Sequence, residues 1–407
     1  MANTVVVIGT LDTKEAEFGY LKELIENKGL KTILIDCSIL GEVSLQPDYT
    51  AAMVARAGKS NLENLRTERQ EGKAMATMIS GATEIVRELY LTGKLDGIIS
   101  LGGTMGTSLG LAVMRTLPSM PKLMVSTMTF TRYISPAVGK DITLMPSIAD
   151  IWGLNRITKQ VVQDAANAIV GMVKNYRKIE SEDKPVIGIT TLGSAVNSFA
   201  PLIKPALDDM GYEAIVFHST GPGGRALEDQ IRQGTIQGVL DLSLHELICH
   251  YCDGDCDPGE DRLQAASETG IPQVVSCASL DFFGWPGSPD TLPPHRRERK
   301  MHMHNPLVWI VRTSAEELAT IGEMAAARLN KANGPVIMLV PMKGFSALDT
   351  PGSLFYDPDA DKAFVKAFES TANSNIKIIK LDLHVNDPQF SAEAINHIDF
   401  LMKINRG

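Results

Sequence analysis

The feature that most constrains the fold is a strand–turn–helix pattern that occurs twice, 181 residues apart, with Thr10 and Thr191 at equivalent places. Residues 4–9 form an apolar run that ends in glycine, as expected of a strand buried on both faces, and residues 186–193 repeat it. Between them, residues 176–185 are charged and end in proline, which is the composition of a linker. The pattern predicts two similar α/β domains, related by duplication or by convergence.

Strand and helix signals alternate within the first of these domains. Apolar runs that indicate buried strands are followed by stretches with the apolar spacing of amphipathic helices. The strand-like runs are 32–36, 97–101, 122–126 and 142–145, and the helical stretches are 73–91, 106–116 and 155–175. Repeated βα units of this kind specify a parallel sheet with helices on both faces. We therefore expect two Rossmann-like subdomains, residues 1–180 and residues 185–407, each a mainly parallel sheet flanked by helices, with a cleft between them.

Two segments break this alternation. Residues 39–72 form a long polar connection that we expect to be partly helical. Residues 279–306 hold five prolines and the basic cluster 295–300. A loop of that length is usually functional, as a lid or an interface arm, and a solvated crossover is the alternative.

Composition excludes several classes of protein. The 39 basic and 48 acidic residues give a net charge of −9, whereas proteins that bind nucleic acid carry a basic face, so nucleic acid is not an expected partner. No apolar run approaches the roughly 20 residues that span a bilayer, and residues 1–9 lack the basic region of a signal peptide. We therefore expect a cytoplasmic protein that has a small-molecule ligand and no membrane partner.

The first strand-to-helix turn is a candidate phosphate site, because helix N–H groups point towards the carboxyl ends of parallel strands. It matches neither the dinucleotide-binding glycine pattern nor the P-loop. Gly9 would let the backbone approach a phosphate, Thr10 and Thr13 offer hydroxyls, and Lys14 offers a positive charge. Asp12 is the candidate carboxylate for Mg²⁺, bound through water. Capping of the helix by Asp12 or Thr13, with Lys14 in solvent, is the alternative.

A second glycine-rich turn, residues 102–107, follows the strand at 97–101. Its glycines permit positive φ angles and would bring N–H groups around an anion. Asp36 ends the second strand, where an acid can bind a ribose hydroxyl, and Thr127 adds a hydroxyl after the fourth strand. The candidate nucleotide ligands are Gly9, Thr10, Asp12, Thr13, Lys14, Asp36, Gly102, Gly103, Thr104, Gly106, Thr107 and Thr127.

The C-terminal half has a glycine loop of its own after a strand at 215–218. Arg225 in this loop would pair with a phosphate or a carboxylate through two parallel hydrogen bonds, and a glycine-rich connector is the alternative. His304 precedes another strand and either points into the cleft or makes a structural hydrogen bond. The candidate anion ligands are Thr220, Gly221, Gly223, Gly224, Arg225 and His304.

Three of the five cysteines lie within eight residues. Cys249, Cys252 and Cys256, together with His250, are candidate ligands for Zn²⁺. No second C-x-x-C completes the set, and the aspartates nearby disfavour thiolates. Free reduced thiols are therefore the favoured interpretation, and a zinc site is the alternative.

In combination, these motifs resemble those of the ATP-binding family that contains the N-terminal region of the tomato tobamovirus-resistance protein and its bacterial and fungal relatives. The matching stretches are residues 9–14, 102–107, 121–128, 153–157, 218–225, 270–275, 304–306 and 344–349. The resemblance implies two Rossmann-like subdomains, adenine nucleotide bound with Mg²⁺ at Gly9, Thr10, Asp12, Thr13 and Lys14, and a homodimer. The chain departs from the family pattern at 249–256, and the plant protein's antiviral role is not transferred.

The expected function is therefore binding of ATP or a related adenine nucleotide, whose phosphates the glycine and hydroxyl loops hold. One alternative is a metabolic enzyme that acts on a small phosphorylated or carboxylated substrate in the cleft between the domains, clamped by Arg225. Another is an interaction module that nucleotide stabilises and that docks through 279–306. The sequence shows no nucleophile motif such as G-x-S-x-G, so it leaves open whether the protein is an enzyme.

Overall fold

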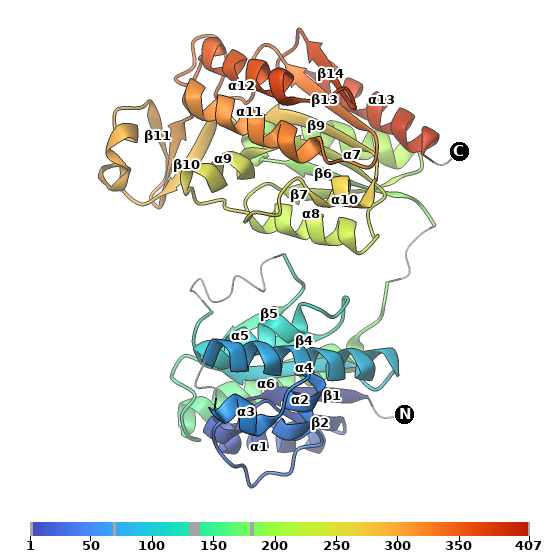
Figure 1. Cartoon of the computed structure of the whole chain (residues 1–407), viewed down its shortest axis with the longest axis vertical. Helices are drawn as coiled ribbons and strands as arrows, with labels where there is room; N and C mark the ends of the chain where they lie inside the picture. The colour runs from blue at the N-terminus through green and yellow to red at the C-terminus, as the bar shows by residue number, and fades with distance from the viewer. Residues whose placement is uncertain (1–2, 68–70, 130–138, 180–182, 406–407) are drawn as a thin grey trace. The chain divides into compact units, whose positions relative to one another are not determined.

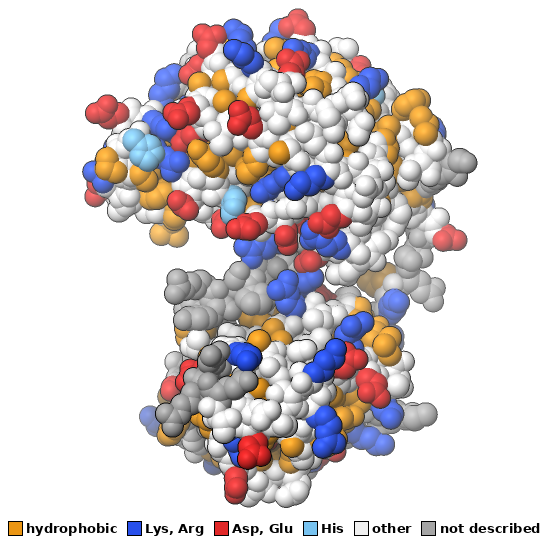
Figure 2. All heavy atoms as spheres, viewed as in Figure 1, with side chains coloured by type: hydrophobic (Ala, Val, Ile, Leu, Met, Phe, Trp, Pro, Cys, Tyr) orange, Lys and Arg blue, Asp and Glu red, His pale blue; other side chains and the backbone are white. Residues whose placement is uncertain are grey.

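The computed structural model describes residues 3–67, 71–129, 139–179 and 183–405 (Figure 1). The chain divides into two compact units, unit 1 (Met1–Glu180) and unit 2 (Ser181–Gly407). Acidic and basic side chains are interspersed over the face of each unit that Figure 2 shows. Among the described residues, every helix is too short or too polar to cross a bilayer.

Unit 1 is built on one sheet of five parallel strands in the order β2-β1-β3-β4-β5. The strands are β1 (Thr4–Gly9), β2 (Lys31–Asp36), β3 (Gly97–Gly102), β4 (Lys122–Ser126) and β5 (Thr143–Pro146). Successive residues of a strand point to opposite faces, so a run buried on both sides has to be apolar throughout. In β1, Val5 and Val7 join the core on one face, whereas Val6 and Ile8 join the core on the other.

Helices cover both faces of this sheet, as the alternation predicts. One face packs against α1 (Leu11–Asn27) and α6 (Arg156–Asn175). The other packs against α2 (Ala51–Ala57), α3 (Leu62–Thr67), α4 (Glu71–Leu91) and α5 (Thr104–Met114). The polar connection 39–72 supplies α2 and α3, so it is partly helical.

Unit 2 repeats this architecture with six parallel strands in the order β14-β13-β9-β8-β6-β7. These are β6 (Val186–Thr191), β7 (Glu213–His218), β8 (Gly238–Ser243), β9 (Gln273–Ala278), β13 (Val336–Pro341) and β14 (Ile376–Leu381). On one face lie α7 (Phe199–Asp209) and α13 (Pro388–Ile404). On the other lie α8 (Pro222–Arg232), α9 (His245–Cys252), α10 (Ala265–Thr269), α11 (Ala315–Leu329) and α12 (Pro358–Thr371). The prediction of two α/β units with parallel sheets flanked by helices is confirmed.

The proline-rich segment 279–306 is not one long loop. It contributes two strands of an antiparallel sheet in the order β10-β12-β11, made of β10 (Phe282–Pro286), β11 (Met301–Asn305) and β12 (Val308–Arg312). Its prolines lie at the end of β10, in and beside the short 3-10 turns that join β10 to β11, and directly after β11. They therefore bound the strands without removing their hydrogen bonds.

Each parallel sheet reverses its strand order beside its first strand. The second strand lies on one side of the first, and the third strand lies on the other, so the reversal falls between β1 and β3 in unit 1 and between β6 and β8 in unit 2. The turns that leave these strands at their carboxyl ends diverge to helices on opposite faces of the sheet. Ligands of open α/β sheets bind at such switch points.

Candidate functional site

A cavity of about 540 Å³ opens at the switch point of unit 2. Its wall includes the turn after β6 (192–195), His218 at the end of β7, Thr220 just beyond it, and His245 after β8. The antiparallel sheet β10-β12-β11 completes the wall and contributes His302 and His304. The cavity therefore combines the carboxyl ends of three parallel strands with an inserted antiparallel sheet, which positions four imidazoles around one space.

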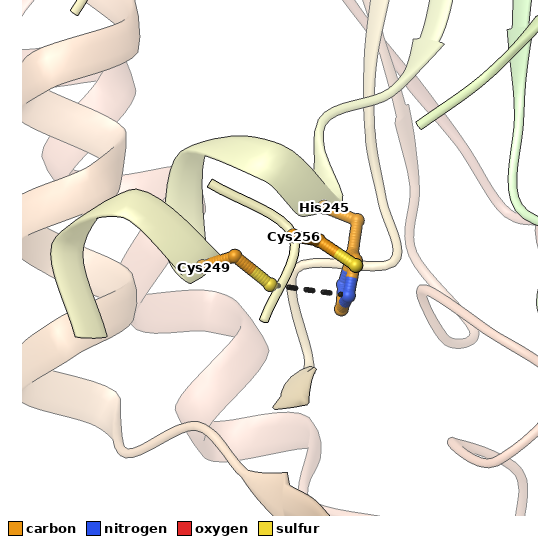
Figure 3. A group of neighbouring side chains, drawn as sticks. All are labelled: His245, Cys249 and Cys256. Atoms are coloured by element: carbon orange, nitrogen blue, oxygen red, sulfur yellow. Dashed lines mark hydrogen bonds between the residues drawn. The ribbon is translucent and has the colours of Figure 1, made fainter. Parts of the chain in front are cut away.

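His245, Cys249 and Cys256 lie together beside this cavity, and we refer to them as the His–Cys–Cys cluster (Figure 3). His245 is the first residue of α9, and Cys249 lies one turn later on the same face of the helix. The chain leaves α9 through Asp253 in the left-handed conformation (φ 56°) and returns Cys256 to the same point. One donor atom from each residue falls within 4.8 Å of the other two, and His245 Nε2 lies 3.3 Å from Cys249 Sγ.

The imidazole of His245 is held in one orientation. Nδ1 lies 3.0 Å from the carbonyl oxygen of Ser279, and the ring packs against Phe282 with 4.7 Å between ring centroids. A carbonyl oxygen only accepts hydrogen bonds, so Nδ1 carries the proton and donates it. In the neutral ring, Nε2 then presents its lone pair to the two sulfur atoms.

The three groups of the cluster perturb one another's protonation. The hydrogen bond from Cys249 and, against the effect of burial, the hydrogen bond and charge of His245 lower the pKa of Cys256 to about 7. Burial and the neighbouring Cys256 raise the pKa of Cys249. Burial alone would lower the pKa of His245, but Cys256, the Ser279 carbonyl and the charge of Asp255 together outweigh this effect and raise it. The arrangement therefore favours one thiolate, at Cys256, beside a protonated imidazole.

The four residues proposed from sequence as zinc ligands do not converge. Cys252 is the last residue of α9, two turns after His245, and its Sγ is 3.7 Å from Glu317 Oε1; burial raises the pKa of its thiol. His250 is paired with Asp257, with 2.8 Å between Nδ1 and Oδ1. The structure thus brings together Cys249 and Cys256 and adds His245. The spacing of His245 and Cys249, four residues apart at the start of a helix, is the signal that could have identified this pair.

The glycine loop that follows β7 binds a carboxylate of the protein itself. The N–H groups of Gly221 and Gly224 donate to Glu246 Oε1 at 2.5 and 3.0 Å. A Cβ atom on Gly224 would lie 1.9 Å from Glu246 Oε2, so this close approach requires glycine. Arg225 donates from Nε to the carbonyl oxygen of Pro258 at 2.7 Å. Of the six proposed anion ligands, Thr220 and His304 line the cavity.

Glu246 belongs to a buried network of charged side chains beside the glycine loop. The guanidinium of Arg262, which is 1% exposed, lies 2.7 Å from Glu246 and 2.5 Å from each oxygen of Asp241. It also lies 3.2 Å from Glu228, whose two oxygens accept the backbone N–H groups of residues 263–265, just before and at the start of α10. One arginine therefore balances three carboxylates and connects β8, α8 and α9.

In unit 1, the turns after β1 and β3 lie side by side because these strands are paired. Thr10 and Thr13 approach each other at 3.4 Å between their hydroxyl oxygens. Lys14 donates from Nζ to the carbonyl oxygen of Ile151 at 2.5 Å. Asp12 Oδ2 accepts the N–H groups of residues 40 and 41 at 3.3 and 3.1 Å. The side chains of Asp12 and Lys14 therefore have partners within the protein, and both threonines lie at the edge of the sheet.

Asp36 contributes to the same edge from within the protein. Its Oδ1 accepts the N–H of Ser38 at 2.9 Å and, at 3.4 Å, the N–H of Leu11 at the start of α1. Burial raises the pKa of this carboxyl. These bonds position Asp36 to cap the first turn of α1.

The turn from Gly102 to Thr107 divides into a packed and an accessible side. A Cβ atom on Gly102 would lie 2.8 Å from the Cα of Gly106, so these glycines let β3 and α5 approach each other. Thr107 is buried and shares a hydrogen bond with Ser126, 2.6 Å away. Gly103, Thr104 and Thr127 are only partly buried. Gly103 precedes α5 without a side chain to cap its N–H groups.

Comparison with known proteins places both units in one family. Residues 3–178 match the model of the N-terminal domain of the Uncharacterised protein family (UPF0261), and residues 184–402 match the model of its C-terminal domain. Among solved structures, a putative UDP-N-acetylglucosamine 2-epimerase from Listeria monocytogenes aligns over 68% of this chain and 79% of its own, at 11% identity and a TM-score of 0.23. That likeness is too weak to bear on function.

Relatives resemble the chain over nearly its whole length. A UPF0261 protein of Clostridium tetani is 39% identical over 96% of this chain and 97% of its own, and one from Brucella suis is 33% identical over 97% and 94%. The tomato ToMV resistance protein Tm-1 is 36% identical over 78% of this chain, a match that spans 42% of the tomato protein. The resemblance identified from the motifs is thus confirmed, and the chain belongs to the UPF0261 family.

Proposed function

We propose that unit 1 binds ATP or a related adenine nucleotide, with the phosphates at the start of α5. The observation that carries this proposal is the glycine at the N-terminal boundary of α5, which adds no capping side chain at a switch point of the sheet. The first N–H groups of a helix have no partner within the helix, and its dipole favours an anion there. Thr10 and Thr13 lie on the adjoining turn, where their hydroxyls would bind phosphate oxygens.

The neighbouring turn is less available to a ligand. The N–H groups of Leu11 and Asp12, at the start of α1, point to Asp36 and Ser38 at 3.4 and 2.8 Å. The phosphates are therefore assigned to α5, and Lys14 would exchange its contact with the Ile151 carbonyl for a phosphate oxygen. Mg²⁺ would accompany the phosphates, with Asp12 as its candidate carboxylate. The homodimer that the family resemblance implies is part of the same proposal, and light scattering with and without nucleotide tests it.

Replacing Lys14 with alanine is expected to weaken nucleotide binding by roughly tenfold or more, since a hydrogen bond to a charged group contributes about 1.5–3 kcal/mol. Calorimetry with ATP, ADP and AMP in the presence of Mg²⁺ measures this. Lys22→Ala is the matched control, because Lys22 lies on the same helix and pairs with Glu26. Absence of binding by all three nucleotides, or equal binding by the Lys14 variant, would contradict the proposal.

A second candidate function is catalysis in the cavity of unit 2 on a small phosphorylated or carboxylated substrate. The imidazoles around the cavity and the His–Cys–Cys cluster favour it. In this proposal Arg225 does not bind the anion, because its guanidinium bonds to the loop at 257–258. Thr220 and His304, which line the cavity, are the anion ligands instead.

A ligand found by thermal-shift screening of phosphorylated and carboxylated metabolites is therefore expected to lose most of its effect on Tm in the His304→Ala variant. Arg225→Ala should retain the shift, provided that the variant folds normally by circular dichroism. The opposite pattern, in which the Tm shift is lost in Arg225→Ala and retained in His304→Ala, would show that Arg225 binds the anion and that His304 does not.

A further inference from the structure

The donor atoms of the His–Cys–Cys cluster have nearly the separations that one small metal ion requires. They all lie within 4.8 Å of one another, and His245 Nε2 is 3.3 Å from Cys249 Sγ. Zinc binds imidazole nitrogen at about 2.0–2.1 Å and thiolate sulfur at about 2.3 Å, so tetrahedral ligands stand about 3.5–3.8 Å apart. Small side-chain adjustments would therefore bring all three atoms into contact with one ion.

The surroundings of His245 are those of a metal-binding imidazole. Its Nδ1–H donates to the carbonyl oxygen of Ser279, so Nε2 is the ring nitrogen that faces the sulfur atoms and would bind a metal ion once deprotonated. Metal-binding histidines usually have such a bond on the other ring nitrogen, because it fixes the tautomer and makes the ligand more basic. Ser279 itself has a φ of 61°, a conformation uncommon for a residue with a side chain.

Backbone hydrogen bonds hold the loop that carries Cys256 against α9 and β10. The N–H of Gly254 donates to the carbonyl oxygen of Cys249 at 2.7 Å, and the N–H of Asp255 donates to the carbonyl oxygen of Gly284 at 3.0 Å. Two sulfur ligands on separate segments are therefore positioned by backbone hydrogen bonds.

The cluster is closed on the side of the core and open on the side of the cavity. Cys249 is buried, whereas His245 and Cys256 both line the cavity, together with His218, His302 and His304. Structural zinc sites have four protein ligands, whereas catalytic sites have three and leave one position for water or substrate. Three converging ligands at the wall of a cavity correspond to the second kind.

We propose that His245, Cys249 and Cys256 bind one Zn²⁺ ion, and that its fourth coordination position faces the cavity and takes water or a substrate oxygen. Two thiolates and one neutral imidazole are a donor set that suits zinc in a tetrahedral geometry. The ion would give unit 2 a Lewis acid that polarises a carbonyl or activates a water molecule. The inference concerns unit 2 and does not depend on nucleotide binding in unit 1.

The test uses the full chain, purified without chelator, with elemental analysis and Co²⁺ titration of the metal-free protein. We expect one metal ion per chain, and with Co²⁺ the thiolate charge-transfer absorption and the visible bands of a tetrahedral site. His245→Gln, Cys249→Ser and Cys256→Ser should each lose this signal. Cys252→Ser and His250→Ala should keep it, because these side chains contact Glu317 and Asp257 instead.

A second measurement needs no variant and so is independent of folding defects. Zn²⁺ should protect Cys256 of the wild-type protein from alkylation by iodoacetamide, and a chelator should restore the reaction. Alkylation that Zn²⁺ does not slow, together with absence of the Co²⁺ bands, would overturn the proposal and indicate a reactive thiolate without metal. Loss of the bands in Cys252→Ser but not in Cys256→Ser would overturn the ligand set.

Discussion

Replacing Arg262 with methionine is expected to lower the free energy of unfolding by about 3–5 kcal/mol, the loss typical when one partner of a buried ion pair is removed. The guanidinium lies within 3.2 Å of Asp241, Glu228 and Glu246, all of which are buried. Without it, three buried carboxylates lose the guanidinium that bonds to each of them. Burial already raises the pKa of both glutamates, and Arg262 opposes that effect. Urea denaturation followed by circular dichroism measures the loss.

The pH dependence separates this effect from a simple loss of packing. In the variant, the pKa values of Glu228 and Glu246 rise further, so the folded state takes up protons that the unfolded state has released. The deficit relative to wild type should therefore shrink as the pH falls from 8 towards about 5. Arg232→Met is the control, because Arg232 pairs with Glu268 at the surface and should change stability by about 0–1 kcal/mol. A deficit in Arg262→Met that is equally small would show that the network contributes little.

Replacing Asp361 with asparagine is expected to stabilise the protein, increasingly so as the pH rises. Burial, a hydrogen bond to Asp349 and the charge of Asp349 raise the pKa of Asp361 from its ordinary value of 3.8 to about 9, against the effect of Arg312. The folded state therefore holds a proton here that the unfolded state has lost above about pH 4. Stability contributed by this group is lost as the pH rises from about 4 to 9, by up to about 1.4 kcal/mol per pH unit.

Asparagine has the hydrogen-bonding pattern of the protonated acid. Its amide oxygen would accept from Arg312, which lies 2.8 Å from Asp361 Oδ1, and its NH₂ group would donate to Asp349. Thermal unfolding of wild type and variant between pH 5 and 9 should give curves that diverge as the pH rises. Asp359→Asn, on the exposed side of the same helix, is the control and should run parallel to wild type. If Asp361→Asn also runs parallel, Asp361 is ionised in the folded state.

The parallel strands could be predicted because burial on both faces requires an apolar residue at nearly every position. The sequence 4–9 could hardly have another role, and β1 covers those residues. The antiparallel sheet of unit 2 carries no such signal. Four of the five residues of β11, from His302 to Asn305, are exposed, so their side chains alternate in no apolar pattern that a reader of the sequence could detect. Its prolines also suggest a loop, although they stand between and beside the strands.

The candidate site was harder to predict because its chemistry depends on what each side chain faces. The sequence pattern of a glycine loop before a helix does not show what its N–H groups bind. They can bind a ligand or, as at Gly221 and Gly224, a glutamate from elsewhere in the chain. Spacing alone also favoured Cys252 over His245. Only the start of α9 at His245 shows that residue 249 lies one helical turn from it, whereas residue 252 lies two turns away.

Glu246 follows His245 directly, and its carboxylate is bound by Arg262 and by two N–H groups, one just before α8 and one in its first turn. The first turn of α9 is therefore fixed to the neighbouring helix and, through Asp241, to the central strand β8. Any displacement of His245 on ligand binding would have to separate buried charges, which carries a large free-energy penalty. This wall of the cavity is consequently preorganised, so adaptation to different ligands would have to come from the exposed strand β11, and the affinity of a metal ion at His245 would lose little to reorganisation of α9.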